Sequence, residues 1–179
     1  MTPLPVSVPP AAAGAGQPAI ATRPGTDADH ADAPGPILLH ASAVAFGPAQ
    51  GVAIIGPAGA GKSTLAMLLI SAGAQLLGDD RLHVFARDGA VFARPPHAIA
   101  GLIERRGLGI LHLCCLRLAR LRLIIDLSAA ETTRLPPPTR HRLCGINLPC
   151  LRAPVTGPAG LATFPLALRQ YMAGAVMEG

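Results

Sequence analysis

The stretch GVAIIGPAGAGKSTLAMLLISAG, residues 51–73, decides the fold of this chain. It begins with an apolar run at 51–55 that predicts a strand, and residues 62–72 predict a helix that ends at Gly73. Between the two, residues 56–63 match the phosphate-loop pattern G-x4-G-K-[ST]. A strand, a glycine-rich turn and a helix in this order predict an α/β domain that binds a nucleotide.

The loop carries the chemistry that a nucleotide requires. Glycines allow successive amide hydrogens to point at phosphate oxygens, and the start of the helix adds a partial positive charge. We expect Lys62 to neutralise the β- and γ-phosphates of ATP and Ser63 to offer its hydroxyl to Mg2+. A chain of this composition would contain the pattern by chance only about 0.001 times. The expected nucleotide-binding residues are Gly56, Pro57, Ala58, Gly59, Ala60, Gly61, Lys62, Ser63 and Thr64.

A pair of carboxylates, Asp79 and Asp80, follows the next apolar run at 74–77. Adjacent residues of a strand face opposite ways, but a turn at the end of the strand can bring both side chains to one pocket. Phosphoryl transfer needs one carboxylate near Mg2+ and often a second that takes the proton of the acceptor. The structural alternative is an aspartate pair that caps a turn. Beside a phosphate loop, the catalytic interpretation is favoured.

Two further segments hold candidate site residues. The run ERRGLGIL at 104–111 places a carboxylate and two guanidiniums ahead of a flexible Gly-x-Gly. Glu104 would assist the metal, and Arg106 would hold a phosphate because a guanidinium matches phosphate oxygens bidentately. A solvated turn is the alternative. His40, in the apolar run before the phosphate loop, is also a candidate, although a lone histidine is more often a packed or hydrogen-bonded residue.

The composition excludes several classes of protein. Of the 179 residues, 50% are hydrophobic and 14% charged, which excludes a wholly disordered chain. The net charge of +5 suits an anionic partner, but with 3% aromatic residues no stacking platform for nucleic acid is visible. The apolar stretch at 65–77 is too short and too interrupted to span a membrane. We therefore expect neither nucleic acid nor a membrane as a partner.

The two ends of the chain differ from its middle. Residues 1–35 are rich in Pro, Ala and Gly and predict a disordered tail without the apolar run of a secretory signal. The four cysteines lack CxxC spacing, so free thiols in the cytoplasm are expected. Residues 36–155 form the expected domain, and residues 156–179 a C-terminal tail with a short helix at 166–172.

Turn residues divide the domain into further short elements. We expect strands at 37–46, 122–127 and 140–148, a hairpin of strands 82–86 and 90–93 with a type I′ turn at Asp88-Gly89, and a helix cap at 128–131.

Four segments, taken together, resemble a known family. They are LLHASAVAF (38–46), GVAIIGPAGAGKSTLA (51–66), GAQLLGDDRLHV (73–84) and LIERRGLGIL (102–111). In this order and at these intervals they resemble the catalytic domain of HPr kinase/phosphorylase, over about residues 36–150. The phosphate loop is generic, but the Asp-Asp-Arg and Glu-x-Arg-Gly-x-Gly-Ile segments are specific to that family.

The resemblance implies an ATP-dependent kinase that phosphorylates a serine of HPr, the phosphocarrier of the phosphotransferase system, and in many members also reverses that reaction. The implied fold is a P-loop kinase domain, similar to the nucleotide domain of phosphoenolpyruvate carboxykinase, with a mixed sheet and flanking helices. Asp79 is implied as the acid/base. Carried over by position, the catalytic residues are His40, Asp79 and Arg106, and the residues near Mg2+ are Ser63, Asp80 and Glu104.

The chain departs from the family pattern in two places. The sizeable N-terminal domain of full-length members is replaced by the tract at 1–35, so the chain is expected to be a short form. The basic C-terminal loop of the family, similar to Pro-x-Arg-Pro-Gly-Arg-Asn, is also missing, because residues 153–158 contain no Arg. A homo-oligomer is compatible with the family, but this departure weakens the expectation of a hexamer and of the phosphorylase direction.

Other nucleotide-binding classes fit less well. A small-metabolite P-loop kinase would normally add an Arg-rich lid, which is not evident. A GTPase needs an N/T-K-x-D motif, which Lys62, the single lysine, cannot supply, and the LSGGQ-like signature of ABC ATPases is missing. A non-catalytic nucleotide sensor that binds HPr or a histidine-kinase partner remains an alternative.

Overall fold

The long strand β9 (Ala119–Glu131) is the centre of a nine-stranded mixed sheet. The run expected as a strand at 122–127 forms its middle, where Leu123, Ile124 and Ile125 are buried in succession, which is typical of a strand between parallel neighbours. β3 (Gly51–Ile55) pairs with it in parallel along one edge. Along the other edge, β6 (Ala90–Arg94) pairs with its beginning and β11 (Ile146–Pro154) with its end.

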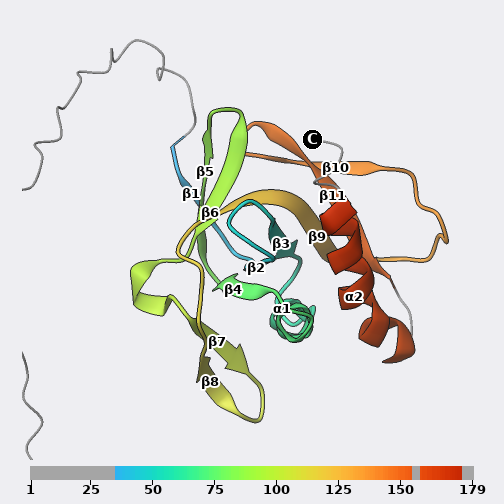
Figure 1. Ribbon diagram of the computed structural model, residues 1–179, viewed down its shortest axis with the longest axis horizontal. Helices are drawn as coiled ribbons and strands as arrows, with labels where there is room; N and C mark the ends of the chain where they lie inside the picture. Colours follow the sequence, from blue (N-terminus) through green and yellow to red (C-terminus); the bar gives the residue numbers. More distant parts are fainter. Residues whose placement is uncertain (1–34, 155–157, 175–179) are drawn as a thin grey trace, which may run out of the picture. The chain divides into compact units, whose positions relative to one another are not determined.

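Figure 1 shows the computed structural model, which describes residues 35–154 and 158–174. The remaining elements are β1 (Ile37–Leu39), β2 (Ser42–Ala45), α1 (Lys62–Ser71), β4 (Gln75–Gly78), β5 (Leu82–Arg87), a 3-10 helix (His97–Ile99), β7 (Leu102–Arg105), β8 (Gly109–His112), β10 (Thr139–Leu143) and α2 (Pro158–Gly174). β7 and β8 form a separate two-stranded sheet. The tail expected at 1–35 lies outside the described residues, except for Gly35.

Each face of the large sheet has its own hydrophobic core. On one face, Val52 and Ile54 of β3 pack in a cluster with both helices, which lie beside each other on the sheet (Figure 1). Ala53, between them, belongs to the cluster on the opposite face, because successive side chains of a strand alternate. The helix residues of the first cluster are Leu65, Ala66 and Leu69 of α1 and Leu168 and Met172 of α2. The expected α/β fold, a mixed sheet with flanking helices, is confirmed.

The helix that follows the phosphate loop begins and ends as its sequence predicts. Gly61 precedes α1 with a φ of 95°, a left-handed conformation that favours glycine. At the other end, Gly73 has a φ of 100° and its amide bonds the carbonyl of Ile70, while the amide of Ala74 bonds the carbonyl of Leu69. These two bonds form a Schellman motif, which satisfies carbonyls at the end of the helix.

The expected hairpin of β5 and β6 is also confirmed. Asp88 and Gly89 both have positive φ values, 49° and 69°, as a type I′ turn requires. A second turn of this kind, at Cys144 and Gly145, joins β10 to β11. The single strand expected at 140–148 is therefore wrong, because the chain reverses in its middle.

The apolar run at 37–46 is two strands instead of the expected one. β1 pairs with β5, whereas β2 pairs with β3 and β4. The chain must pass from one part of the sheet to another between them, and His40 and Ala41 lie at this crossing. The break therefore puts His40 beyond the regular strand.

Two expectations near the C-terminus also differ from the structure. The helix cap expected at 128–131 is wrong, because β9 continues to Glu131 and pairs there with Pro154 of β11. The short helix expected at 166–172 runs over Pro158–Gly174 and buries Leu168 and Met172 against the sheet. No helix within the described residues has the length and apolar character needed to cross a membrane.

Gly51 of β3 lies close to the backbone of β9 and provides a test of this packing. A Cβ at this position would lie 2.7 Å from the carbonyl oxygen of Arg120, so the backbone would have to shift. We expect Gly51→Ala to lower the free energy of unfolding by about 1–3 kcal/mol. Urea denaturation measures this change, with Gly174→Ala as a control because its added Cβ meets open space. Equal losses in both variants would contradict the prediction.

Candidate active site

The phosphate loop, residues 56–63, joins the end of β3 to the start of α1. Gly56 has a φ of 142°, and a Cβ there would lie 3.0 Å from the Cβ of Leu127 in β9. A side chain at Gly56 would therefore meet both backbone strain and a neighbouring strand. The first turn of α1, including Lys62 and Ser63, follows directly, so the positive end of the helix faces the loop.

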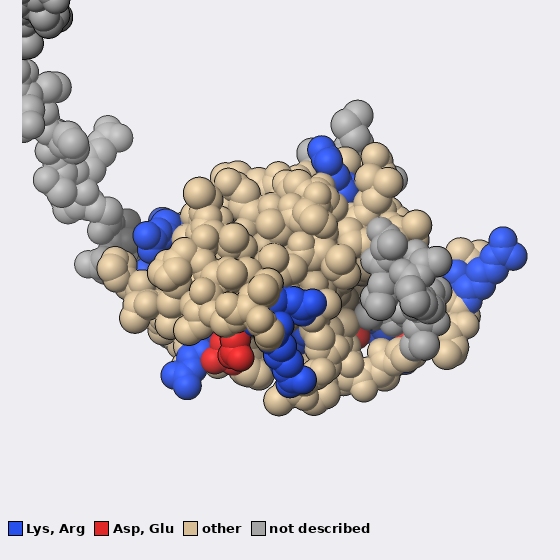
Figure 2. Space-filling view, turned by 90° about the horizontal axis from the view of Figure 1, so that it is seen from below, with Lys and Arg blue, Asp and Glu red and all other residues tan. Residues whose placement is uncertain are grey.

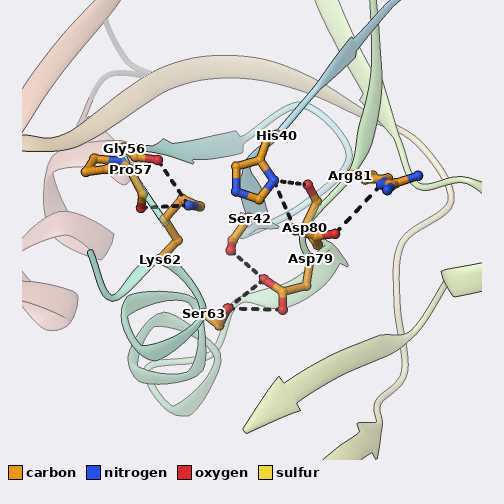
Figure 3. A network of polar contacts seen from close by, with 9 residues as sticks. All are labelled: His40, Ser42, Gly56, Pro57, Lys62, Ser63, Asp79, Asp80 and Arg81. Atoms are coloured by element: carbon orange, nitrogen blue, oxygen red, sulfur yellow. Dashed lines mark hydrogen bonds and ion pairs between the residues drawn. The ribbon is translucent and has the colours of Figure 1, made fainter. Parts of the chain in front are cut away.

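Lys62 lies within the loop and is only 7% exposed. Its Nζ donates hydrogen bonds of 3.0 Å to the carbonyl oxygens of Gly56 and Pro57 (Figure 3). These bonds satisfy the ammonium group and hold a positive charge at the centre of the loop. A buried cation within a glycine-rich loop at the start of a helix is the electrostatic environment that a phosphate requires.

Asp79 follows β4 and is also 7% exposed. Its Oδ1 accepts hydrogen bonds from the hydroxyls of Ser42, at 2.5 Å, and Ser63, at 3.0 Å. Oδ2 lies 3.1 Å from the Ser63 hydroxyl. A buried carboxylate is costly unless it is hydrogen-bonded, and the two serines provide these bonds. The network joins β2, β4 and α1 at one point (Figure 3).

Asp80 points away from Asp79, toward His40 and Arg81 (Figure 3). Its backbone has a φ of 69°, which turns the chain sharply at the end of the strand. Nδ1 of His40 lies 2.9 Å from the carbonyl oxygen of Asp80 and 3.0 Å from its Oδ1. Because both partners are acceptors, Nδ1 carries the proton. The side chain of Asp80 is 62% exposed, and Nε of Arg81 lies 3.8 Å from its Oδ2.

A pocket of about 490 Å³ collects these side chains. All six residues expected to act in catalysis or to hold a metal line the pocket. They are His40, Ser63, Asp79, Asp80, Glu104 and Arg106. Of the expected nucleotide-binding residues, those on its wall are Ala58, Gly59, Gly61, Lys62, Ser63 and Thr64. Gly56, Pro57 and Ala60 of the loop are not part of the wall.

The hairpin of β7 and β8 forms another wall of the pocket. Glu104 and Arg106 lie on it, as does Ile110. The segment is a hairpin whose turn, at residues 106–108, is exposed, as are the side chains of Glu104 and Arg106. Nη1 of Arg105 donates a hydrogen bond of 2.8 Å to Oγ1 of Thr64, in the first turn of α1.

Sequence reasoning missed two polar residues of this pocket, Ser42 and Arg105, as well as its apolar lining of Ile99, Leu102, Ile103 and Ile110. Ser42 lies two positions after His40. In the single strand expected at 37–46 this spacing would place both side chains on one face, and this was the available signal. The bond from Arg105 to Thr64 spans 41 positions, and no local pattern points to it.

Charged side chains line the pocket, although they are few in the chain as a whole. Lys62, Asp79, Asp80, Glu104, Arg105 and Arg106 all lie on its wall. Figure 2 shows one face of the molecule on which a small acidic group lies among basic groups, on a surface that is otherwise uncharged. This agrees with a charged content of 14%.

The donors around Asp79 suit Mg2+. Among residues 35–154 and 158–174, no three His, Cys, Asp or Glu side chains gather as a metal cage. Mg2+ does not need such a cage, because it is usually bound by one or two carboxylates together with water and substrate phosphates. The hydroxyl of Ser63 and the carboxylate of Asp79 are adjacent hard oxygen donors beside the phosphate loop. They fit this ion better than Asp80, which turns away toward His40.

Known proteins are similar to this chain in sequence and in fold. The family model "HPr Serine kinase C-terminal domain" matches residues 38–163. A protein from an Azoarcus species named HPr kinase/phosphorylase is 36% identical over 127 residues, 63% of this chain and 40% of that protein. One of the same name from Enterococcus faecalis is 45% identical over 62 residues, 34% of this chain and 20% of that protein.

A solved structure supports the same relationship. The structure of the Hpr(Ser) kinase/phosphatase from Coxiella burnetii matches with a TM-score of 0.66 and 25% identity, over 80% of this chain and 99% of that chain. The chain spans 40% of the Azoarcus relative, so the likeness concerns the domain rather than that whole protein. Because the family model covers most of the described residues, this chain belongs to the HPr serine kinase C-terminal domain family.

Proposed function

We propose that this protein is a kinase that transfers the γ-phosphoryl group of ATP to a serine of the phosphocarrier protein HPr. The observation that carries the proposal is the single pocket in which the phosphate loop and both aspartates meet. Its relatives, named HPr kinase/phosphorylase, support the choice of HPr as acceptor. We propose the kinase direction only. Residues 153–158 lack the arginines of the family's basic C-terminal loop, and the absence of that loop weakens the expectation of the phosphorylase reaction.

The phosphate loop would bind the triphosphate of ATP. Its amides would bond the phosphate oxygens, and the ammonium of Lys62, now on the carbonyls of Gly56 and Pro57, would bond the β- and γ-phosphates. Ser63 and Asp79 would hold Mg2+, which when bound neutralises charge on the phosphates. Arg106, on the opposing hairpin, would contact a phosphate oxygen, with Glu104 near the metal.

The roles of the two aspartates would then be the reverse of those expected from sequence, with Asp79 near the metal and Asp80 as the base. Asp79 is buried and bonded to Ser63, which is the arrangement of the metal-binding aspartate in P-loop enzymes. Asp80 is exposed in the pocket and free to meet an incoming hydroxyl, with His40 holding its carboxylate. The seryl hydroxyl would give its proton to Asp80 while its oxygen bonds the γ-phosphorus and the bond to ADP breaks.

The direct test is mass spectrometry of HPr after incubation with this protein, ATP and Mg2+. The proposal expects phosphoserine on HPr that is absent without ATP. Nucleotide binding without any transfer would instead indicate a regulatory sensor. Transfer to a small molecule but not to HPr would indicate a small-metabolite kinase. Either result would overturn the proposal.

Removal of the loop cation tests the nucleotide site. We expect Lys62→Ala to lower HPr phosphorylation by at least about 10²-fold, because no other lysine exists to neutralise the β- and γ-phosphates. Titration calorimetry with ATP should show a matching loss of affinity, with circular dichroism to confirm folding. Arg87→Ala, an exposed cation outside the pocket, is the control. Wild-type transfer by Lys62→Ala would refute the role of this residue.

The division of tasks between the aspartates is tested by amide substitutions. Asp80→Asn should lower transfer by about 10²- to 10⁴-fold with ATP affinity retained, because an amide cannot accept the seryl proton. Asp79→Asn should instead raise the Mg2+ concentration needed for half-maximal rate. Asp88→Asn is a matched control, since Asp88 is also exposed with a left-handed backbone but lies outside the pocket. If Asp79→Asn loses transfer and Asp80→Asn raises the Mg2+ requirement, Asp79 is the base, as expected from sequence, and the proposed division is wrong.

A further inference from the structure

The β7–β8 hairpin is anchored to the rest of the protein at its base. Ile103 is 1% exposed and packs in the same cluster as Leu65 and Leu69 of α1. The far end of the hairpin is different, because Leu108 is 73% and Ile110 64% exposed. Packing therefore positions the first residues of the hairpin but not its tip.

Two glycines in open space lie at the tip of the hairpin. Gly107 and Gly109 have φ values of 84° and 88°, and a Cβ at either would meet nothing within 4 Å. Glycines in open space offer little resistance to rotation. Glu104 and Arg106 lie between the buried Ile103 and these glycines, so their distance from the phosphate loop depends on what holds this part of the hairpin.

Arg105 supplies such a restraint. Its guanidinium reaches from β7 to the hydroxyl of Thr64, at 2.8 Å, in the first turn of α1. Within the described residues, we find no other side-chain hydrogen bond between the hairpin and α1. Thr64 immediately follows Ser63, which is part of the Asp79 network. The bond thus joins the two walls of the pocket at the level of the phosphate loop.

We propose that Arg105 is a positioning residue, which through its hydrogen bond to Thr64 holds Glu104 and Arg106 at the height of the bound phosphates. This inference rests on the proposed kinase function for its effect on rate, but not for its effect on the hairpin. Neighbouring residues of a strand share one backbone, so restraint of Arg105 also restrains the residues on both sides of it. Arg105 itself would not contact the reacting atoms.

The experiment compares variants that remove either end of the bond. Arg105→Met keeps a long side chain without donors, and Thr64→Val keeps the shape without the hydroxyl. Each should lower the kcat for HPr phosphorylation by about 3- to 10-fold, as expected for the loss of one exposed hydrogen bond, with a smaller change in the KM for ATP. Thr64→Ser, which keeps the hydroxyl, should recover most of the loss seen in Thr64→Val.

Two further measurements separate positioning from a general loss of structure. The double variant should lose no more than either single variant, because both remove the same bond. Amide hydrogen exchange over residues 102–112 should be faster in Arg105→Met than in the wild type. Arg87→Met, an exposed arginine on the distant β5–β6 hairpin, should leave both the rate and this exchange unchanged.

The outcomes also distinguish this inference from the function on which it rests. If the wild type phosphorylates HPr but the losses of the single variants multiply in the double variant, the positioning role is overturned. Unchanged hydrogen exchange in Arg105→Met would also overturn it. If the wild type transfers no phosphate to HPr, the proposed function fails, and hydrogen exchange alone still decides whether the bond restrains the hairpin.

Discussion

The parallel pairing of β3 with β9 is the constraint on which the rest of the structure depends. It buries Val52 and Ile54 on the helical face of the sheet and Ala53 on the other. It also fixes the end of β3, where the phosphate loop begins, beside β9, because Gly56 lies close to Leu127. A loop that binds phosphate must present its amides in one direction, and a buried parallel strand supplies that rigidity.

A second constraint comes from the buried carboxylate of Asp79. In the register of β2 with β3, Ser42 pairs with Ile54. In the register of β2 with β4, its neighbour Ala43 pairs with Gly78, the residue before Asp79. Ser42 is therefore carried to the position where Asp79 needs a donor, and Ser63 comes from the helix on the other side. Sheet register and active-site geometry thus have the same cause. A shift of β2 by one residue would leave the carboxylate short of a partner.

The adjacent aspartates illustrate how a strand end creates different environments. Asp79 retains the direction of β4 and is buried, whereas the left-handed backbone of Asp80 turns its side chain toward His40 and solvent. Two hydroxyl donors hold the buried carboxylate of Asp79 in one position, as a site for a metal ion requires. Asp80, beside His40, is instead open to solvent. In the proposed function, this turn of the backbone separates a carboxylate that would hold the metal from one that would meet the substrate.

The sequence alone determined the features that depend on neighbouring residues. The phosphate loop, the ends of α1 and the type I′ turn at Asp88-Gly89 each follow from a few consecutive residues and the backbone angles that glycine permits. The candidate site was also found in outline, because motifs such as the paired aspartates are contiguous. All six residues expected to act in catalysis or to hold a metal line one pocket.

Only the tertiary structure decided the features that join distant parts of the chain. Ser42 and Asp79 are 37 positions apart, His40 and Asp80 are 40 apart, and Arg105 and Thr64 are 41 apart. The same holds for the break between β1 and β2 and for the extension of β9 to Glu131, since each depends on the strand that lies alongside. Strand pairing and side-chain hydrogen bonds form between segments whose separation in the sequence carries no periodic signal, so packing of the whole domain selects them.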